Sequence, residues 1–573
     1  MSEAATADVP AGRFAGVLGW LKRRPLLILA LFCLTLWTPG ILSLPAFDRD
    51  ESRYAQASKQ MLESGDFVDI RFGAVPRYKK PVGIYWMQAA TTEVAGLGDR
   101  SHIWTYRLPS LLGAIAAVWL AFWCARAFAS VEAAFLAAAL LGSTILLAAE
   151  ATLATTDAAL LACVLGAQGV LLRTYIGART NGPPPSLRLA LAGWVAFAIG
   201  ILVKGPLIAG VVGASIVALS VWDREWRWLR PIRPFVGLGL TLLIVLPWLI
   251  AIGVQSHGQF LEQSLGHDFA AKLQGGEESH GAWPGYFLLL ATLTFWPAIL
   301  FLLPGLTAAI RQRTEPAQRF LLVWIASWWL IVELVPTKLP HYVLPVYPAL
   351  AMLAAIWALG SGEAPTRWER MLRYVAALQF ALGAAALTAA PIILSKLYGE
   401  GAEWCLIAAA GSGAAIALGA LIAFLWRANT AAAMLTFVSV LVFYPLLTAF
   451  VGPGLEQLWV SPRAAAAVEA LTKPSDPPPA LAGYVEPSLV FALGTETRQT
   501  DGRGAADAGA AQGGLALVED REQSAFLAHL AELETDASEV GSVSGFNYSR
   551  GRRVHVRIYR VVPLHDAASP PPE

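Results

Sequence analysis

Long runs of apolar residues, separated by short charged or Pro/Gly-containing segments, occupy most of residues 1–455. Runs of about 17 to 25 apolar residues are long enough to cross a bilayer as helices. The segment around Lys204 fits either two short spans or one broken span. The pattern predicts a polytopic α-helical membrane domain with about thirteen transmembrane helices, at approximately residues 25–45, 106–125, 130–148, 154–173, 189–204, 206–222, 235–254, 285–307, 319–335, 342–360, 373–394, 403–425 and 431–451.

Basic residues are distributed unevenly between successive connections. Lys and Arg accumulate on the cytoplasmic side of short loops, so such a bias indicates the topology. Every second connection is rich in arginine, whereas the connections on the other side carry, after the first loop, only Lys204, Lys272, Lys338 and Lys396. This bias places the N-terminus in the cytoplasm and the first loop, residues 46–105, on the outer face. That loop is an exception to the rule because it is itself strongly basic.

The first loop contains two helical patterns that are too polar or too short to span a membrane. In SRYAQASKQMLESG, one helical stripe carries Tyr54, Ala57, Met61 and Leu62. The following YKKPVGIYWMQAATTEVAGLG is rich in aromatic residues, but its apolar part is only about 17 residues long. Both patterns are typical of helices that lie in the plane of the membrane interface. The loop is therefore expected to carry acids and bases to the membrane surface.

The pattern changes at about residue 456, where the long apolar runs stop. Short segments punctuated by Pro and Gly follow, and AAAAVEAL has a helical pattern. The segments ALAGYV, SLVFALG, LALVED and VHVRIYRVV have the length and composition of strands. They predict a small soluble α/β domain over residues 456–573, with a Gly/Ala-rich loop at 502–514 and a disordered DAASPPPE tail. Thirteen crossings would put this domain on the same outer face as the first loop.

Composition supports a membrane protein and narrows its partners. Of the 573 residues, 56% are hydrophobic and only 14% are charged, whereas a soluble domain carries about 25% charged residues. The net charge of +1, without a basic stripe interleaved with aromatics, argues against nucleic acid as a partner. The four cysteines lie in apolar runs without CxxC spacing, which disfavours a zinc site or a disulfide framework. Lipids or lipid-bound groups are the expected partners.

Ionisable and phenolic residues recur in the connections assigned to the outer face. Charges at membrane depth are costly, so they tend to face a polar cavity and to pair. Cations together with hydroxyl donors suit a phosphate group, and a carboxylate among them suits proton removal or the positioning of a nucleophile. The candidates are Asp50, Glu51, Arg53, Lys79, Lys80, Asp157, Lys204, His257, His267, Asp268, Glu333, Lys338, His341, Tyr342 and Tyr347.

Each of these residues also has a structural explanation. Asp50 and Glu51 fit the N-terminus of a helix that begins near Ser52, and Asp157 fits an N-cap. Lys79 and Lys80 fit lysines that are anchored among anionic lipid headgroups. The structural explanations do not account for the convergence of cations, tyrosines and acids on one face, which favours a shared cavity.

Several strings resemble, in order, those of a known family. They are DESRYAQASKQMLESGDF, YKKPVGIYWMQA, RLPS, TTDAALL, VKGPL and TKLPHYVLPVYPALA. Together they are similar to the bacterial lipid-linked aminoarabinose transferases and their protein O-mannosyltransferase-like relatives, which are C-type glycosyltransferases dependent on polyprenyl-phosphate sugars. The likeness extends from the first span to about residue 350, and GYVEPSLVFALG also resembles a family segment.

The resemblance implies site residues. The essential first-loop acid of the family corresponds to Asp50, and its second acid to Asp157; both are expected to be catalytic. Relatives often carry an acid where this chain has Lys79, so any role of that acid is either absent here or taken by Glu51. The donor phosphate and lipid are expected to contact further residues. These substrate-binding residues are Arg53, Lys80, Lys204, Tyr342, Lys338 and Tyr347.

The activity implied is transfer, with inversion, of 4-amino-4-deoxy-L-arabinose from undecaprenyl phosphate to a lipid A phosphate, in a bacterial inner membrane with the active site facing the periplasm. Such a reaction lowers the negative charge of lipid A and gives resistance to polymyxin. The alternatives are a protein O-mannosyltransferase that uses polyprenyl-phosphate mannose, or transfer of another sugar to another lipid. No cofactor is required by this scheme; if a divalent metal binds, Glu51 and His267 are the candidate ligands. A transporter is disfavoured because the ionisable residues gather at one face.

Overall fold

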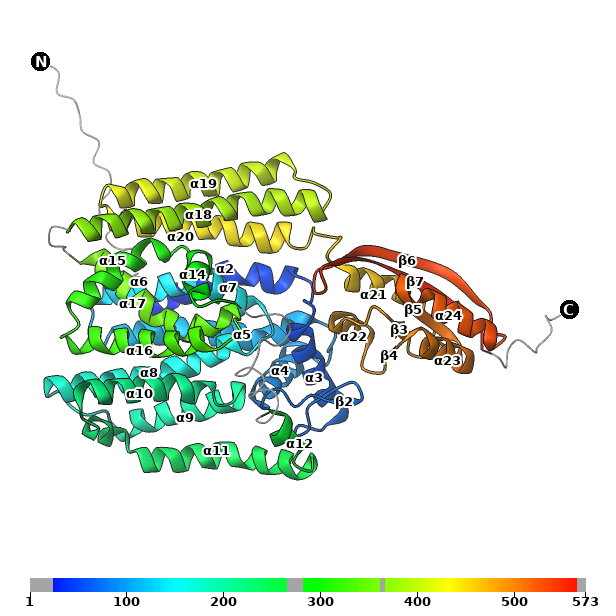
Figure 1. The fold of residues 1–573 in the computed structure, drawn as a ribbon, viewed down its shortest axis with the longest axis horizontal. Helices are drawn as coiled ribbons and strands as arrows, with labels where there is room; N and C mark the ends of the chain where they lie inside the picture. The colour runs from blue at the N-terminus through cyan, green and yellow to red at the C-terminus, as the bar shows by residue number, and fades with distance from the viewer. Residues whose placement is uncertain (1–23, 265–281, 361–365, 564–573) are drawn as a thin grey trace, which may run out of the picture.

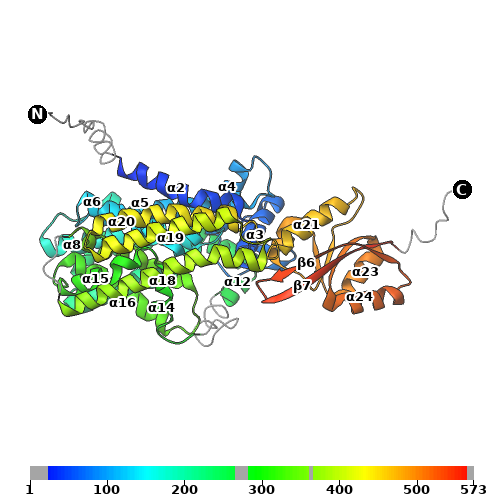
Figure 2. The same ribbon diagram turned by 90° about the horizontal axis from the view of Figure 1, so that it is seen from above.

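A helical bundle and a smaller mixed α/β domain make up the protein (Figure 1). The structure is a computed structural model that describes residues 24–264, 282–360 and 366–563. The bundle helices lie roughly side by side along the long axis of the molecule, and the C-terminal domain extends from one end of the bundle (Figures 1 and 2). The helices of the bundle are α2 (Pro25–Ser43), α5 (Ile103–Ala125), α6 (Val131–Ser143), α7 (Ile145–Thr152), α8 (Asp157–Thr180), α9 (Leu187–Lys204), α10 (Leu207–Asp223), α11 (Pro234–Gln255), α14 (Tyr286–Thr294), α15 (Ile299–Arg311), α16 (Pro316–Leu334), η4 (Pro340–Val346), α17 (Tyr347–Leu359), α18 (Arg367–Tyr398), α19 (Trp404–Leu425), α20 (Asn429–Pro445) and η5 (Leu446–Val451).

The predicted multi-pass membrane fold is confirmed, but the number of clear spans is smaller than thirteen. In the described part of the chain ten helices are long and apolar enough to cross a membrane, and a bent pair, α6 with α7, makes up to eleven. Two other predicted spans correspond to the shorter apolar helices α10 and α15. Apolar length alone does not separate a full crossing from a short or broken helix, because both bury a continuous apolar run.

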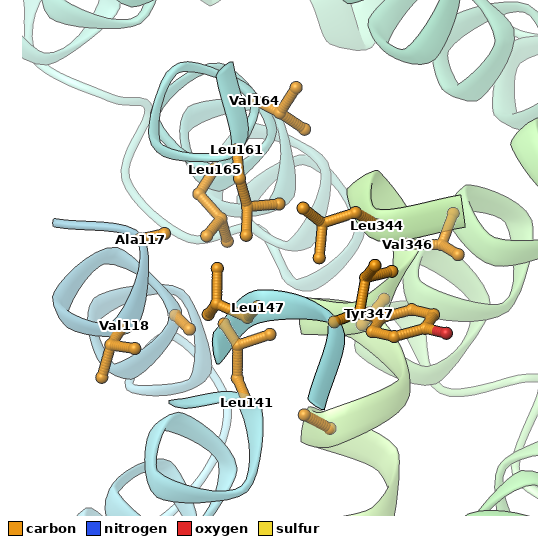
Figure 3. Close-up of a cluster of buried hydrophobic side chains, with 14 of the residues drawn as sticks. Ala117, Val118, Leu141, Leu147, Leu161, Val164, Leu165, Leu344, Val346 and Tyr347 are labelled. Atoms are coloured by element: carbon orange, nitrogen blue, oxygen red, sulfur yellow. The ribbon is translucent and has the colours of Figure 1, made fainter. Parts of the chain in front are cut away.

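Small residues allow the central helices of the bundle to pack closely. Alanine and glycine are frequent on α5, α6, α8 and α17, and small residues let helix backbones approach in a membrane protein. Larger side chains from α5, α7, α8 and the η4–α17 segment fill the space between these backbones (Figure 3). The labelled members of this cluster are Ala117, Val118, Leu141, Leu147, Leu161, Val164, Leu165, Leu344, Val346 and Tyr347.

The first loop forms the two predicted helices, with a short hairpin between them. These elements are α3 (Asp50–Ser64), β1 (Arg71–Phe72), β2 (Val75–Pro76) and α4 (Gly83–Ala95). Tyr54, Ala57 and Met61 of the predicted apolar stripe are buried, but Gln56 and Ser58 are buried as well. The Gln56 side-chain amide donates to the Thr495 hydroxyl of the C-terminal domain at 2.7 Å, and the Ser58 hydroxyl donates to Gln88 of α4 at 2.8 Å. α3 is therefore sandwiched between protein elements and does not rest on lipid with one face in water.

The C-terminal domain is a five-stranded mixed sheet with helices on both faces. The strand order is β4-β3-β5-β7-β6, with β3 parallel to β4 and β5, and β7 antiparallel to β5 and β6. Alternate residues of β5 point to opposite faces: Leu515 and Leu517 pack with α21 and α22, whereas Ala516 and Val518 pack with α23 and α24. The elements are α21 (Val460–Leu471), β3 (Ala480–Ala482), α22 (Pro487–Leu493), β4 (Arg498–Thr500), α23 (Gly502–Gln512), β5 (Gly514–Glu519), α24 (Asp520–Glu532), β6 (Ala537–Asn547) and β7 (Arg552–Val561).

Two predictions for this domain are wrong. SLVFALG forms helix α22 where a strand was expected, because Pro487 supplies a favourable first helical residue and a short apolar run fits either structure. The Gly/Ala-rich segment forms helix α23 where a loop was expected. Its signals are the Asp501 side chain, which accepts from the Gly504 amide at 2.8 Å, and Gly513 with φ 71° just after the helix. The predicted DAASPPPE tail lies outside the described residues.

A polar junction joins the C-terminal domain to the segment just before α3. The Tyr548 hydroxyl accepts from the Asp48 amide at 2.7 Å, and the Asp48 carboxylate accepts from the Ser488 hydroxyl. The Arg49 guanidinium donates to the Ser549 carbonyl oxygen. Arg49 itself has φ 67°, a conformation that non-glycine residues seldom adopt without support from their surroundings. The C-terminal domain thus holds the backbone from which α3 and its first residue, Asp50, begin.

Candidate active site

Four segments end at the same place in the bundle, beside the start of α3, and each brings a polar side chain. Asp157 is the first residue of α8 and Lys204 is the last residue of α9. Glu150 lies near the end of α7, and His341 lies in the short helix η4. Acids are stabilised at helix N-termini and cations at helix C-termini, so Asp157 and Lys204 occupy positions that favour their charges.

Asp157 and Lys204 form a buried ion pair. Lys204 Nζ lies 2.5 Å from Asp157 Oδ1, and the two side chains are only 6% and 8% exposed. The Thr156 hydroxyl also donates to Asp157 Oδ2 at 3.3 Å. The N-cap residue of α8 is Thr156, and Asp157 is the first residue inside the helix. The alternative of a plain helix cap therefore does not describe Asp157.

Glu150 and His341 complete the buried cluster. Glu150 Oε2 accepts from the Thr155 hydroxyl at 2.7 Å, and Glu150 Oε1 lies 3.9 Å from His341 Nδ1. One ligand atom each from Glu150, Asp157 and His341 lie within 4.8 Å of one another. Two carboxylates and an imidazole are a donor set that a divalent cation accepts. Such an ion would have to share Asp157 with the Lys204 ammonium.

Two glycines bring the first loop against this cluster. A Cβ on Gly83 would lie 2.7 Å from the backbone carbonyl carbon of Leu202, so only glycine lets α4 approach the end of α9 this closely. Gly205, with φ 73°, turns the chain directly after Lys204 and faces the Pro81 ring. The segments KKPVG and VKGP are consequently in contact, and this contact places Lys80 near the cluster.

Asp50 faces open space beside buried cationic and phenolic groups. Its carboxylate is 68% exposed, and Oδ1 lies 3.7 Å from the buried Arg77 guanidinium. Arg77 stacks over the Tyr54 ring at 5.2 Å. Burial would lower the pKa of Arg77, but Tyr85, Tyr54 and Asp50 together raise it, so the guanidinium stays charged. Burial raises the pKa of Tyr54 and of Tyr85, which keeps both hydroxyls protonated and able to donate.

Asp50 also interacts with the buried cluster, in addition to its ion pair with Arg77. The Asp50 carboxylate is close enough to interact electrostatically with Glu150 and with His341, and Lys80 is close enough to interact with His341. The His341 ring packs edge-on against Tyr342, with ring centroids 5.1 Å apart. The predicted residues Asp50, Lys80, Asp157, Lys204 and Tyr342 therefore lie in one neighbourhood.

A cavity of about 720 Å³ opens between α3, the β1–β2 hairpin and the C-terminal domain. Its lining includes four cations and one acid, so it favours an anionic guest. Arg53 and Arg77 of the first loop line it, and Arg77 is the ion-pair partner of Asp50. The charged residues of the lining are Arg53, Arg77, Lys79, Arg498 and Glu496.

Two predicted substrate contacts lie elsewhere. Tyr347 is fully buried in the bundle core, where its hydroxyl pairs with the Thr294 hydroxyl at 2.6 Å (Figure 3). Lys338 is buried too, and its ammonium donates to the carbonyl oxygens of Val332 and Glu333 at 2.9 and 2.6 Å. These are the last carbonyls of α16, so Lys338 caps that helix. Both residues have structural roles and do not face the cavity.

Glu51 is also not available as a metal ligand. Its two carboxylate oxygens accept from Arg107 Nε and Nη2 at 2.8 and 2.9 Å, and further from the Ala154 and Phe47 amides at 2.8 Å each. Every strong acceptor position of this buried carboxylate is used, so a metal would have to displace Arg107. The other proposed metal ligand, His267, lies outside the described residues.

Glu150 and Arg77 were not among the residues predicted from the sequence, and His341 had no predicted role. Glu150 is the only acid in the apolar segment STILLAAEATLA, and an isolated acid in such a run is itself a signal of a polar site. Arg77 carries no comparable signal, because it is one of several basic residues in the first loop. Only the hairpin β1–β2 brings it back to Asp50.

Known proteins resemble this chain in sequence and in fold. Residues 22–258 match the family described as dolichyl-phosphate-mannose-protein mannosyltransferase. Among curated relatives, the undecaprenyl phosphate-alpha-4-amino-4-deoxy-L-arabinose arabinosyl transferase 2 of Pseudomonas fluorescens is 29% identical over 53% of this chain and 54% of its own length. The corresponding transferase of Pectobacterium carotovorum is 27% identical over 67% and 68%. The chain thus spans about half to two thirds of the length of these curated relatives.

The fold is that of the C-type glycosyltransferases. The structure of ArnT from Cupriavidus metallidurans bound to undecaprenyl phosphate superposes with a TM-score of 0.72 at 19% identity, over 94% of this chain and 98% of that one. The archaeal oligosaccharyltransferase AglB from Archaeoglobus fulgidus gives a TM-score of 0.53 at 12% identity. Part of the chain, residues 22–258, is thus similar to the protein mannosyltransferase family, and the fold is ArnT-like.

Proposed function

We propose that this protein is an inverting membrane glycosyltransferase that takes its sugar from a polyprenyl phosphate. The observation that carries the proposal is the exposed Asp50 carboxylate 3.7 Å from the Arg77 guanidinium, which also lines a cation-rich cavity. The family supports the same class of reaction. The specific reaction proposed is transfer of 4-amino-4-deoxy-L-arabinose from undecaprenyl phosphate to a lipid A phosphate, at the periplasmic face of the inner membrane.

Lys80, Arg53 and Arg77 are proposed to bind the donor phosphate. Breaking the bond between the sugar and the phosphate leaves additional negative charge on the departing phosphate oxygen. Cations that are already in place stabilise this charge without reorganising during the reaction. The Tyr342 hydroxyl and the buried Lys204 are proposed to add positive potential on the side of the site that holds the departing phosphate. Bond making from the opposite face of the anomeric carbon then inverts its configuration.

Asp50 is proposed to act on the side of the sugar from which the acceptor attacks. If the acceptor is a hydroxyl, the carboxylate removes its proton as attack proceeds. If the acceptor is a lipid A phosphate, the nucleophile is already anionic, and Asp50 instead orients the donor through the ammonium of the aminosugar. In both cases the carboxylate must remain accessible, as its 68% exposure allows.

Asp157 is proposed to act by positioning the cationic side of the site. Its carboxylate is occupied by Lys204, so it is not a free base. The pair holds the Lys204 ammonium at the end of α9, beside the segment that carries Lys80. In this scheme no metal is required, because protein cations supply the charge at the donor phosphate.

Replacement of Asp50 by Asn tests the proposal. In a strain that lacks the native protein and is complemented with Asp50→Asn, aminoarabinose on lipid A should fall about 100- to 10,000-fold, the usual contribution of a positioned acid or base. The readout is mass spectrometry of lipid A together with polymyxin resistance. Glu93→Gln is the matched control, because Glu93 is an exposed acid of the same loop that pairs only with Arg100 in the described structure. Full modification with Asp50→Asn would overturn the proposal.

Protein O-mannosylation is the second candidate function, since the family match is to protein mannosyltransferases. A transfer assay with the purified enzyme distinguishes the two functions. Transfer of mannose from a polyprenyl phosphate to a serine- or threonine-containing peptide, without transfer to lipid A, would select the second.

A further inference from the structure

A second cation-lined cavity lies at the opposite end of the bundle from the C-terminal domain. It has a volume of about 580 Å³ and is bounded by α15, α17, the start of α18 and the α19–α20 connection. Tyr398, at the far end of α18, packs against Phe546 of the C-terminal domain. Arg373, which lines the cavity, precedes Tyr398 by roughly 38 Å of helix at 1.5 Å per residue. The cavity is therefore separate from the proposed active site.

Three guanidinium groups and one carboxylate line this cavity. Arg373 is fixed in place: it stacks on the Phe424 ring at 4.3 Å and donates to Asn429 Oδ1 at 3.3 Å. Arg427 is close enough to Arg373 for the two like charges to repel each other. The third arginine, Arg311, pairs with the carboxylate, Glu369, at 2.7 Å. An excess of positive charge remains, which an anion placed between Arg373 and Arg427 would neutralise.

A buried amide without a partner also faces the cavity. Gln318 is 8% exposed, and its Oε1 atom has no hydrogen-bond partner among the described residues. Leaving a buried polar group unsatisfied costs free energy, so such a group indicates that something else binds there. A guest that carries a hydroxyl beside its anionic group would satisfy Gln318 while it binds the arginines.

The surroundings of the cavity indicate a membrane lipid as the source of the anion. Trp368 and Trp426, next to the cavity, are 71% and 81% exposed. Exposed tryptophans at the ends of transmembrane helices typically lie among lipid headgroups. Basic pockets between transmembrane helices at this depth bind anionic headgroups. A soluble anion would have no need of this aromatic border.

We propose that this cavity binds the phosphodiester headgroup of an anionic glycerophospholipid whose headgroup carries hydroxyls, as phosphatidylglycerol does. The phosphodiester lies between Arg373 and Arg427, and a headgroup hydroxyl donates to Gln318 Oε1. The site is not part of the proposed catalytic reaction, and it can be tested without any transfer assay.

The test measures binding of phosphatidylglycerol to the full-length protein in detergent by native mass spectrometry, with phosphatidylcholine and inorganic phosphate as the comparison probes. Arg427→Gln should weaken phosphatidylglycerol binding about tenfold, the effect of losing one charge-assisted hydrogen bond. Arg427 is exposed and its guanidinium makes no hydrogen bond or ion pair within the described ranges, so the variant should fold. Arg370→Gln is the matched control: it removes an exposed arginine of α18, the helix that carries Arg373, and Arg370 does not line the cavity.

The outcomes separate the alternatives. Preference for phosphatidylglycerol over phosphatidylcholine, lost in Arg427→Gln and kept in Arg370→Gln, supports the site. Equal losses of phosphatidylglycerol binding in the two variants would show only a general attraction of the basic surface for anionic lipid. That result would overturn the proposed site. Displacement of the lipid by inorganic phosphate would also overturn it, in favour of a site for a free anion.

Discussion

Lys204, the last residue of α9, and Asp157, the first residue of α8, are joined by a buried ion pair of 2.5 Å. The two residues are separated by almost the whole of two helices in sequence, so the pair fixes how α8 and α9 end relative to each other. Glu150, a second buried acid, lies beside the pair. Removing the cation would leave two carboxylates buried together.

Lys204→Met is accordingly expected to destabilise the protein by about 3–5 kcal/mol, the usual cost of breaking a buried ion pair from one side. Thermal unfolding in detergent measures the loss. The double variant Lys204→Met with Asp157→Asn should recover much of the stability, because it removes both charges, yet it should not recover transfer activity. Equal stability of Lys204→Met and the native protein would show that the pair is not buried as described.

Arg107 and Glu51 form a second buried pair, whose role is expected to be structural. Arg107 donates to both Glu51 oxygens and also to the carbonyls of Ile41, Leu44 and Pro45 at the end of α2. Lysine is not able to reproduce these five contacts, because it lacks the planar fork of arginine. Arg107→Lys should therefore lower the yield and melting temperature of the protein, by about 3–5 kcal/mol in stability. The protein that does fold should keep its turnover number, and a large fall in turnover at unchanged stability would instead assign a catalytic role to the pair.

Asp157 and Lys204 were predicted from charges at the ends of apolar runs, and the structure brings the two side chains together. Their roles in the reaction stay predictions. The predictions that failed concern the direction in which a side chain points. Tyr347 follows Tyr342 closely in sequence, but the chain between them is a 3₁₀ helix and Tyr347 already begins α17, so its side chain points into the core.

The remaining errors arose because the local sequence does not carry the information that decides these features. Nothing in the local sequence of Arg77 shows that a hairpin returns it to Asp50, since that contact depends on tertiary folding. Likewise, the burial of α3 on its second face depends on a domain that begins several hundred residues later. Helix α22 was missed because a short apolar run carries too few residues to show a period of 3.6.

The junction at Asp48 should loosen as the pH rises. Burial raises the pKa of Asp48 from 3.8 to about 6, partly offset by the hydrogen bond from Ser488. The folded state thus binds the proton more tightly than the unfolded state, so the stabilisation is present below about pH 4 and is lost as the pH rises through about 6. Hydrogen exchange in the β6–β7 turn, measured at about pH 5 and at about pH 8 and corrected for the intrinsic exchange rate, should show less protection at the higher pH.

Asp48→Asn provides the control for this effect. The amide has nearly the shape of the protonated acid and does not titrate, so protection of the same turn should vary less with pH than in the native protein. In the variant the Ser488 hydroxyl keeps a side-chain oxygen to donate to, and the backbone amide of residue 48 still donates to the Tyr548 hydroxyl. An unchanged pH dependence in Asp48→Asn would assign the effect to other groups, such as Glu486.

Removal of divalent metal is expected to leave transfer unchanged. The Lys204 ammonium already occupies Asp157, and Arg77 and Lys80 supply positive charge at the rim of the cavity. The measurement is the rate of transfer by the purified protein before and after treatment with a chelator. A loss that added Zn²⁺ or Mn²⁺ restores would contradict this expectation, and His341→Ala would then show whether the ion sits in the buried cluster.

The approach of α4 to α9 at Gly83 should be necessary for the site to form. A Cβ at this position would meet the carbonyl carbon and oxygen of Leu202 at 2.7 and 2.8 Å, and backbone atoms do not move aside as a flexible side chain does. Gly83→Ala should therefore push α4 away from α9, cost about 1–3 kcal/mol of stability and move Lys80 away from Lys204. The expected result is a fall in both melting temperature and transfer rate. Gly213→Ala is the matched control, because a Cβ there meets nothing within 4 Å inside helix α10, and alanine in a helix interior should stabilise by about 0.5–1 kcal/mol. Equal behaviour of the two variants would show that the close contact at Gly83 does not position the first loop.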